Sequence, residues 1–265
     1  MILDCFVHRD GGLRRVSREV ASEEPLRIVV NGRPLAVLVR MPGNEEELGL
    51  GFLLTEGIVR SVREVKTIGL HRENPGGANE LRVTLADVDS PDEKHSANRT
   101  VRSPKNPLGT KPIEEVASGI SPFDRRPGRL AAGDVYALAE HMRAAQECFR
   151  RTGGTHAAAI GALPLNAESI VVREDIGRHN ALDKVVGAAM KKGLDFSRSL
   201  VFLSSRLSCK MVAKAARAGC SDVAGVSAPS AAAVDLAHRL RMFLAGFARG
   251  ETMTVYSGPE ALASS

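Results

Sequence analysis

Tryptophan is absent from this chain of 265 residues, and its only aromatic side chains are eight phenylalanines and two tyrosines. No stretch interleaves aromatic with basic residues, as a stacking platform for single-stranded nucleic acid requires. No apolar run reaches the length of a membrane span, and residues 1–10 lack the basic and hydrophobic regions of a secretory signal. We therefore expect a cytoplasmic protein that binds neither nucleic acid nor a membrane.

Cysteine is also scarce. The chain has four cysteines, and no two of them are separated by the two residues typical of zinc and redox motifs. This spacing favours reduced, packed thiols over a disulfide framework, and it predicts no metal site. The four residues are Cys5, Cys148, Cys209 and Cys220.

Size and charge suit a globular protein with a small anionic ligand. With 43% apolar residues the chain can bury a full core, either as one large domain or as two unequal lobes. Its 36 basic residues exceed its 31 acidic ones, giving a formal net charge of +5. This balance suits an anionic ligand or an acidic partner better than nucleic acid.

Residues 1–86 are predicted to form a small β-rich lobe. Two runs of β-forming residues within 26–42 flank Asn31-Gly32, which is a strong hairpin signal. Further strands are expected at residues 67–73 and 80–86.

One helix is expected in the same lobe. Asn44 precedes three glutamates and apolar residues at helical spacing, so we expect Asn44 to cap a helix that is stopped by Gly57. The following stretch, residues 87–112, is polar and lacks periodicity, which predicts a long loop. We place this loop in a linker over residues 87–125.

Residues 126–265 alternate helical and strand patterns, which predicts an α/β lobe. Crossover helices between strands imply a mostly parallel sheet covered on both faces, a three-layer α/β/α sandwich. Ligands of such sheets bind at the carboxyl ends of the strands. Helices are expected near residues 134–152, 178–192, 208–218 and 231–242, and Asp134 is the expected cap of the first. A strand hairpin is expected around Asn166, and further strands near residues 200–203, 222–227, 243–248 and 253–256.

Residues 152–184 hold the densest group of chemically capable side chains, at two junctions between elements. On the predicted helix after Gly177, a 100° step per residue places Arg178 and His179 on the apolar stripe, pointing inward. An inward arginine at a helix N-terminus makes a site for phosphate. Alternatively, Arg178 pairs with Glu174 or Asp175 and His179 merely packs.

The same helix carries two further charged residues. Lys184 falls on the opposite side of the predicted helix, where we expect it to be solvated, and Asp183 falls on the border. His156 begins the strand after Gly153-Gly154 and precedes an alanine run. By itself it is typical of a packed core histidine, and its candidacy rests on the neighbouring junction.

Further junctions have a similar design. Ser205 follows a predicted strand and is a candidate helix cap, with Arg206 reaching toward the crevice or lying on the surface. Ser227 or Ser230 is the expected cap of the next helix. Near the C-terminus, Phe247 is placed either to stack on a base or to pack in the core, and Arg249 to meet a phosphate.

Several of these segments, in this order, resemble the formate dehydrogenase accessory protein family. The resemblance implies a cytidine-deaminase-like fold for the larger lobe and a cytoplasmic homodimer. It also implies sulfurtransferase activity, in which persulfide sulfur from a cysteine desulfurase passes to the molybdenum (or tungsten) bis-molybdopterin guanine dinucleotide before this cofactor enters formate dehydrogenase. The matching segments are residues 31–35, 51–58, 152–159, 173–184, 205–206 and 226–229.

The resemblance also implies where the dinucleotide binds. The family segment for the guanine dinucleotide matches Phe247, Ala248, Arg249, Gly250, Glu251 and Thr252, and GDP is the expected surrogate ligand. Together with His156, Arg178, His179, Ser205 and Arg206, these residues form the predicted binding site.

The chain departs from the family where the chemistry is expected. The family carries its reactive cysteine in a Cys-Gly-x-Cys-Gly loop, and alignment on Gly109 and Ile113 places Lys105 and Leu108 at the two cysteine positions. Neither side chain can carry sulfur, so no catalytic residue is predicted. Cys209 lies at a predicted helix start, where the dipole lowers a thiol pKa, but the family has an aromatic residue there, which is typical of packing.

Two hypotheses follow. The protein is either a sulfurtransferase whose thiol comes from elsewhere, or a module that binds and delivers the cofactor without carrying sulfur. Zinc-dependent deamination, suggested by fold analogy, is disfavoured because the Pro-Cys-x-x-Cys ligands are missing.

Overall fold

The Asn31-Gly32 hairpin forms as predicted and begins a four-stranded sheet. In the computed structural model, which describes residues 1–71, 79–86, 113–124 and 127–263, β3 (Glu24–Val30) and β4 (Arg33–Arg40) are joined by Asn31 and Gly32, both at positive φ. The sheet order is β4-β3-β6-β5, with β5 at Val65–His71 and β6 at Asn79–Leu85. The predicted loop at 87–112 lies outside the described residues.

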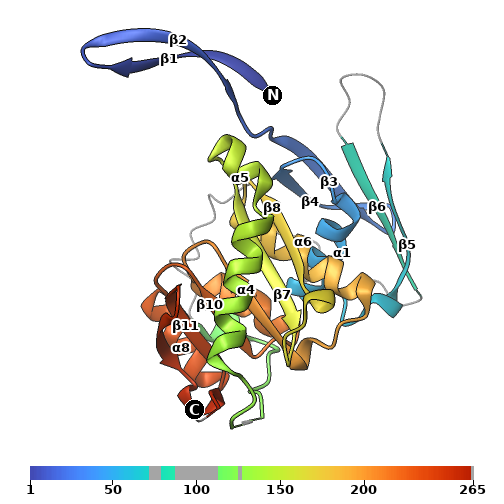
Figure 1. Cartoon of the computed structure of the whole chain (residues 1–265). Coiled ribbons are helices and arrows are strands. Elements are labelled where there is room, and N and C mark those ends of the chain that lie inside the picture. Colours follow the sequence, from blue (N-terminus) through green and yellow to red (C-terminus); the bar gives the residue numbers. More distant parts are fainter. Residues whose placement is uncertain (72–78, 87–112, 125–126, 264–265) are drawn as a thin grey trace.

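A separate hairpin precedes this sheet. Strands β1 (Ile2–Arg9) and β2 (Gly12–Glu19) pair only with each other and project from the body of the molecule (Figure 1). Large apolar side chains on this hairpin are exposed, among them Phe6 (66%) and Leu13 (68%). Residues 1–20 therefore form an arm with little core of its own.

Helix α1 (Glu45–Thr55) occupies its predicted position but is not capped as expected. Asn44 is in the left-handed region, and its side chain makes no capping hydrogen bond. Its backbone carbonyl accepts the first helical hydrogen bond, from the Leu48 N–H at 2.9 Å. The prediction of a side-chain cap was therefore wrong, whereas the predicted stop before Gly57, which has a positive φ, is confirmed.

The larger sheet has the order β12-β11-β10-β9-β7-β8 and is mixed rather than mostly parallel. Only the β9–β10 and β10–β11 pairs are parallel, because the hairpins at both ends of the sheet reverse direction. Strand β7 also runs antiparallel to β9. The strands are β7 (His156–Ala162), β8 (Val171–Asp175), β9 (Ser199–Leu203), β10 (Asp222–Gly225), β11 (Phe243–Arg249) and β12 (Thr252–Ser257).

Helices cover both faces of this sheet, which confirms the predicted α/β class (Figure 1). In β7, β9, β10 and β11 neighbouring residues enter two different hydrophobic clusters, as strands buried on both faces require. Ala157 and Ala159 of β7 pack toward α4 (Ala132–Ala145), whereas Ala158 and Ile160 pack on the opposite side. That opposite side is covered by α6 (Arg178–Lys192), α7 (Cys209–Arg217) and α8 (Ala231–Arg239), with α3 (Ile113–Ala117) against α7.

The helix predicted at 134–152 is two helices. α4 begins two residues before Asp134, so Asp134 lies in the first turn and does not cap it. The chain leaves helical geometry at Gln146 and resumes as α5 (Glu147–Thr152). The Arg150 guanidinium donates to the backbone carbonyls of Arg143 (3.2 Å) and Ala144 (2.7 Å) at this break.

Other predicted boundaries are mostly confirmed. Helix α6 has the predicted bounds, and Ser230 caps α8 by accepting the Ala233 N–H. Helix α8 ends at Arg239, before the predicted residue 242, and α7 follows Ser208, so the expected cap by Ser205 was wrong.

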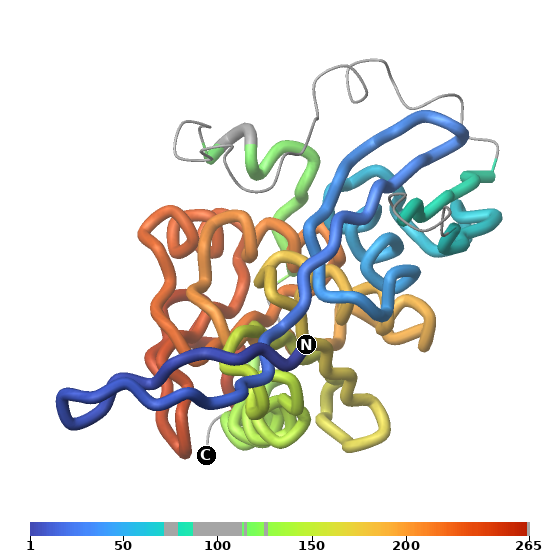
Figure 2. The backbone as a smooth tube through the Cα atoms, turned by 90° about the horizontal axis from the view of Figure 1, so that it is seen from above, coloured from blue at the N-terminus to red at the C-terminus, as the bar shows by residue number. Residues whose placement is uncertain are grey.

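Helices α1 and α6 cross at very short range because each has a glycine at the contact. A Cβ at Gly51 would overlap the backbone carbonyl of Asp183, and one at Gly187 would overlap that of Glu47. α1 packs between α6 and the four-stranded sheet, and Leu26 and Leu81 of that sheet belong to the same hydrophobic cluster as Val185 of α6. Figure 2 shows the backbone from above, turned by 90° from Figure 1. This contact fixes the small sheet to the large one.

Candidate functional site

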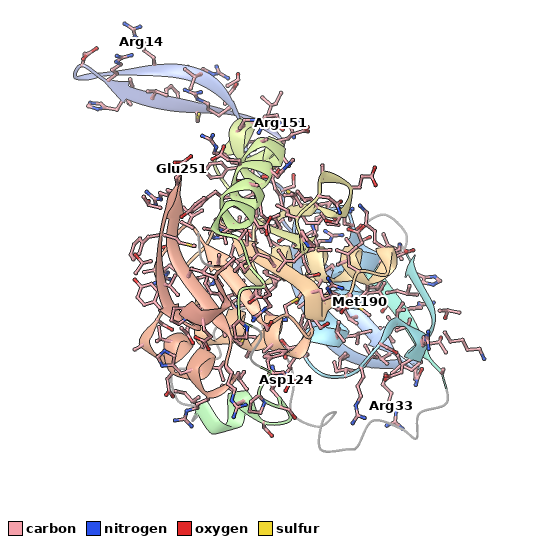
Figure 3. All side chains as sticks on the ribbon, turned by 60° about the horizontal axis from the view of Figure 1, so that its bottom comes forward. Arg14, Arg33, Asp124, Arg151, Met190 and Glu251 are labelled. Carbon is pink, nitrogen blue, oxygen red and sulfur yellow. The ribbon has the colours of Figure 1, made fainter. Side chains whose placement is uncertain are left out.

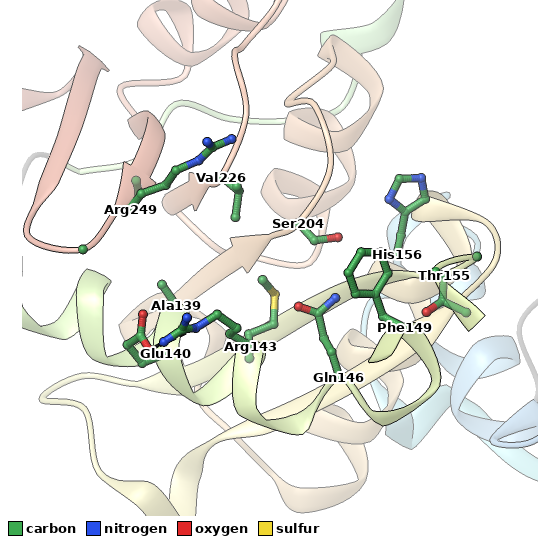
Figure 4. Close-up of a pocket in the computed structure, with 15 residues that line it drawn as sticks. Ala139, Glu140, Arg143, Gln146, Phe149, Thr155, His156, Ser204, Val226 and Arg249 are labelled. Carbon is green, nitrogen blue, oxygen red and sulfur yellow. Dashed lines mark hydrogen bonds and ion pairs between the residues drawn. The ribbon is translucent and has the colours of Figure 1, made fainter. Parts of the chain in front are cut away.

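A pocket of about 670 Å³ opens at the carboxyl ends of the parallel strands of the large sheet. Ser204 and Val226 follow the ends of β9 and β10, and His156 begins the antiparallel β7 at the same end of the sheet. Arg249 reaches the pocket from the end of β11 (Figure 4). The expectation that a ligand site lies at the carboxyl ends of the strands therefore agrees with the position of this pocket.

The turn between β11 and β12 provides one side of the pocket. Ala248, Arg249 and Gly250 line it. Phe247 has a positive φ of 52° and is 47% exposed, so its interpretation as a core phenylalanine was wrong. Glu251, which lies at the turn (Figure 3), and Thr252 are not among the lining residues. The Thr252 hydroxyl donates to the Arg249 carbonyl at 3.1 Å.

Helices α4 and α5 provide the facing wall, which the sequence analysis missed. The break at Gln146 directs side chains of both helices to the same space, because α5 starts in a new direction. In Figure 4 the ring of Phe149 lies between Gln146 and His156. One signal pointed here: this segment leads directly into Gly153-Gly154, at the predicted junction. The lining residues from these helices are Ala139, Glu140, Met142, Arg143, Gln146 and Phe149.

His156 is a neutral side chain in the pocket at ordinary pH. Burial and the nearby positive charge of Arg178 both lower the pKa of His156. The backbone beside it is fixed, because the Ser204 hydroxyl accepts the Ala157 N–H at 2.8 Å. A neutral imidazole offers one donor and one acceptor to a ligand.

Arg178 and His179 begin α6 beside His156 and are not among the residues that line the pocket. Both are partly buried, in agreement with the predicted inward direction. The pairing of Arg178 with Asp175 is not seen, since Asp175 is taken by Lys184, and the buried Arg178 Nε has no hydrogen-bond partner within the described part of the chain. Burial and the charges of Lys214, Lys210 and Arg178 lower the pKa of His179 to about 3.

Two expectations on α6 were wrong. Lys184, expected in solvent, is fully buried, and its ammonium lies 2.7 Å from the Asp175 carboxylate and 2.9 Å from the Met41 carbonyl. Asp183, expected on the border, is 1% exposed and accepts from Lys214 at 2.8 Å and from the Thr55 hydroxyl at 2.7 Å. The helical projection failed because α1 packs against the side of α6 that carries Asp183, and the end of β4 with Met41 packs against the side that carries Lys184.

The next junction contributes through a different residue than predicted. Ser205 is buried and donates to the Arg206 carbonyl at 3.2 Å, while the Arg206 side chain is exposed. Neither lines the pocket, whereas Ser204 does.

The thiols for which a pKa shift is resolved are not activated. Burial, reinforced by Asp235, raises the pKa of Cys209, so the expected lowering by the helix dipole does not prevail. Burial likewise raises the pKa of Cys220, which is fully buried. Lys105 and Leu108 lie outside the described residues, and no group of three or more potential metal ligands occurs within the described ones.

Comparisons with known proteins agree with the resemblance read from the motifs. Residues 21–263 match the profile of the FdhD/NarQ family. The chain is 38% identical over 263 residues to the sulfur carrier protein FdhD of Streptomyces avermitilis, covering 96% of this chain and 93% of the relative. It is 40% identical over 249 residues to the same-named protein of Mycobacterium tuberculosis, covering 90% and 89%.

A solved structure is similar along nearly the whole chain. It is the crystal structure of a protein from Desulfotalea psychrophila, provisionally assigned as a formate dehydrogenase accessory protein. The TM-score is 0.76 at 25% identity, with 99% of this chain and 98% of that chain covered.

Within the described residues, no helix is long and apolar enough to cross a membrane.

Proposed function

Because the chain belongs to the FdhD/NarQ family, we propose that it is an accessory protein of formate dehydrogenase maturation that binds the molybdenum (or tungsten) bis-molybdopterin guanine dinucleotide as its substrate. The pocket at the sheet edge holds one guanine nucleotide end of this molecule. The proposal places the protein in the cytoplasm, with formate dehydrogenase as the recipient of the cofactor.

The arrangement of the pocket carries the proposal. Arg143 and Arg249 reach it from two different walls, and guanidinium groups are well suited to a diphosphate. Phe149, which is 46% exposed, presents an aromatic face on which a base stacks. A volume of about 670 Å³ is in the range of sites for ligands of this size.

For the sulfur step, we propose that this chain binds and delivers the cofactor without carrying sulfur on the family's loop. Lysine and leucine at positions 105 and 108 cannot form a persulfide. The raised pKa values of Cys209 and Cys220 also disfavour these thiols as nucleophiles. The other candidate is sulfur transfer from a cysteine desulfurase through one of the four cysteines, and it is favoured by the names of the relatives.

Calorimetric titration with GDP tests the binding role. Loss of a hydrogen-bonded charge costs about 1.5–3 kcal/mol, so Arg249→Ala should weaken GDP binding at least about tenfold. Arg33→Ala, on β4 in the small sheet (Figure 3), removes the same charge far from the pocket residues and should leave the affinity unchanged. Absence of binding by the unaltered protein at millimolar GDP would refute the proposal.

Mass spectrometry separates the two sulfur hypotheses. After incubation with a cysteine desulfurase and cysteine, the binding role predicts no gain of a sulfur atom on this chain. A persulfide that is lost in a single cysteine variant would instead identify the carrier thiol. In cells lacking the family protein, rescue by Lys105→Cys but not by the unaltered chain would support the binding role.

We also propose that the protein is a homodimer and that the arm formed by residues 1–20 takes part in it. A two-stranded hairpin is marginally stable by itself in water. Ile2, Phe6 and Leu13 on one face of this arm are each more than 60% exposed. Contact with a second copy would cover them.

A further inference from the structure

We propose that Glu174 is a positioning residue that holds two walls of the pocket together and thereby sets its affinity for a nucleotide. This inference rests on the proposed nucleotide-binding role of the pocket. Glu174 lies on β8, the edge strand of the large sheet, and is not one of the residues that line the pocket.

The Glu174 carboxylate accepts three hydrogen bonds from two separate segments. One oxygen accepts the Cys148 backbone N–H at 2.9 Å. The other accepts the Phe149 backbone N–H and the Thr155 hydroxyl, both at 2.8 Å. The start of α5 and the turn that precedes His156 are thus joined through one side chain.

Helix α5 depends on this carboxylate because it has little else to support its first turn. It has six residues, and the preceding Gln146 supplies no side-chain cap. Short helices are marginal in water, and the first N–H groups of a helix have no partner within it. A carboxylate that accepts two of these N–H groups also interacts favourably with the helix dipole.

Both segments bring lining residues to the pocket. Phe149 lies in the capped turn of α5, and Thr155 and His156 belong to the other segment. The neighbouring Asp175 points to the opposite face of the strand, where it pairs with the buried Lys184. The carboxylates of Glu174 and Asp175 therefore lie on opposite faces of the sheet, and of these two only Glu174 acts on the pocket.

The absence of tryptophan provides a clean test, because Phe149→Trp introduces a single fluorescent reporter into the wall. In this background Glu174→Ala should increase quenching of the reporter by acrylamide without ligand, and it should weaken GDP binding about tenfold or more. Glu174→Gln, which keeps the shape but not the charge, should show smaller changes in the same direction.

Glu147→Ala is the matched control. Glu147 is an exposed acid in the first turn of the same helix, so its removal changes the charge equally without removing the Glu174 carboxylate. We expect its quenching and affinity to stay within about twofold of the reporter protein. Circular dichroism at the assay temperature confirms that each variant is folded, and Thr155→Val, which removes one of the three bonds, replaces Glu174→Ala if that variant does not fold.

The outcomes separate this inference from the proposed function. If the reporter protein does not bind GDP and neither does the unaltered chain, the proposed function fails, while quenching without ligand still tests the positioning by Glu174. If GDP binds and Glu174→Ala matches Glu147→Ala in both measurements, the inference is overturned. Increased quenching together with weaker binding, confined to the variants that remove bonds of Glu174, supports it.

Discussion

The close crossing of α1 and α6 predicts that one methyl group at Gly187 destabilises the protein. A Cβ there would overlap the Glu47 carbonyl and would lie 2.9 Å from the Glu47 Cα. Carbon atoms in contact ordinarily stand about 3.5–4.0 Å apart. The obstructing atoms belong to helix backbone and cannot turn aside, so the helices must separate by on the order of 1 Å.

Two opposing effects determine the magnitude. Alanine is favoured over glycine in a helix interior by about 1 kcal/mol. Overpacking costs about 1–3 kcal/mol and more where backbone must shift, and here the separation also disturbs the buried Asp183–Lys214 pair beside the crossing. We expect Gly187→Ala to lower the free energy of unfolding by about 2 kcal/mol or more, which is about 4–8 °C in Tm for a chain of this size.

Urea unfolding followed by circular dichroism measures this loss. The control is Gly133→Ala, since Gly133 is exposed in the first turn of α4 and a Cβ there meets nothing within 4 Å. It should be neutral or stabilising by up to about 1 kcal/mol. Equal stability of the two variants would refute the reasoning.

Three other expectations concern buried charge, pH and the arm. Lys184→Met leaves the buried Asp175 without its cation and should lower the free energy of unfolding in urea by about 3–5 kcal/mol. Adding Asp175→Asn should recover part of this loss, which would confirm that the unpaired buried charge is responsible. An undiminished loss in the double variant would contradict this explanation. His179, with its pKa lowered to about 3, stays neutral in the folded state while the unfolded chain takes up a proton near pH 6.5, so stability should fall as pH drops from about 6.5 toward 3. The slope approaches about 1.4 kcal/mol per pH unit, and an identical pH dependence in His179→Gln would exclude this residue as its source. Deletion of residues 1–20 should convert a dimer into a folded monomer in sedimentation experiments, and an unchanged dimer would show that the arm is not the interface.

Local signals in the sequence predicted the elements well. The Asn31-Gly32 turn and the bounds of α6 are confirmed, because positive φ at a turn and a regular apolar stripe are decided within a few residues. The assignment of Arg249 to the binding site rested on the family resemblance, and Arg249 is among the residues that line the pocket.

What the sequence did not predict depends on contacts between distant segments. Lys184 was assigned to solvent because a helical projection assumes one buried side, and the end of β4 with Met41, more than a hundred residues earlier, covers the side that carries Lys184. Phe149 was missed because nothing local distinguishes the break at Gln146 from a continuous amphipathic helix. Cys209 was placed correctly at a helix start, but the burial that raises its pKa comes from the tertiary structure.

The pocket is assembled from α4, α5 and the ends of four strands, so it has no counterpart in the unfolded chain. Any ligand that occupies it therefore binds only the native state and shifts the folding equilibrium by mass action. At one hundred times its dissociation constant such a ligand adds about 2.7 kcal/mol to the free energy of unfolding. Thermal denaturation can thus rank candidate nucleotides without an assay of activity, and the cargo would itself protect this protein from degradation while it is held.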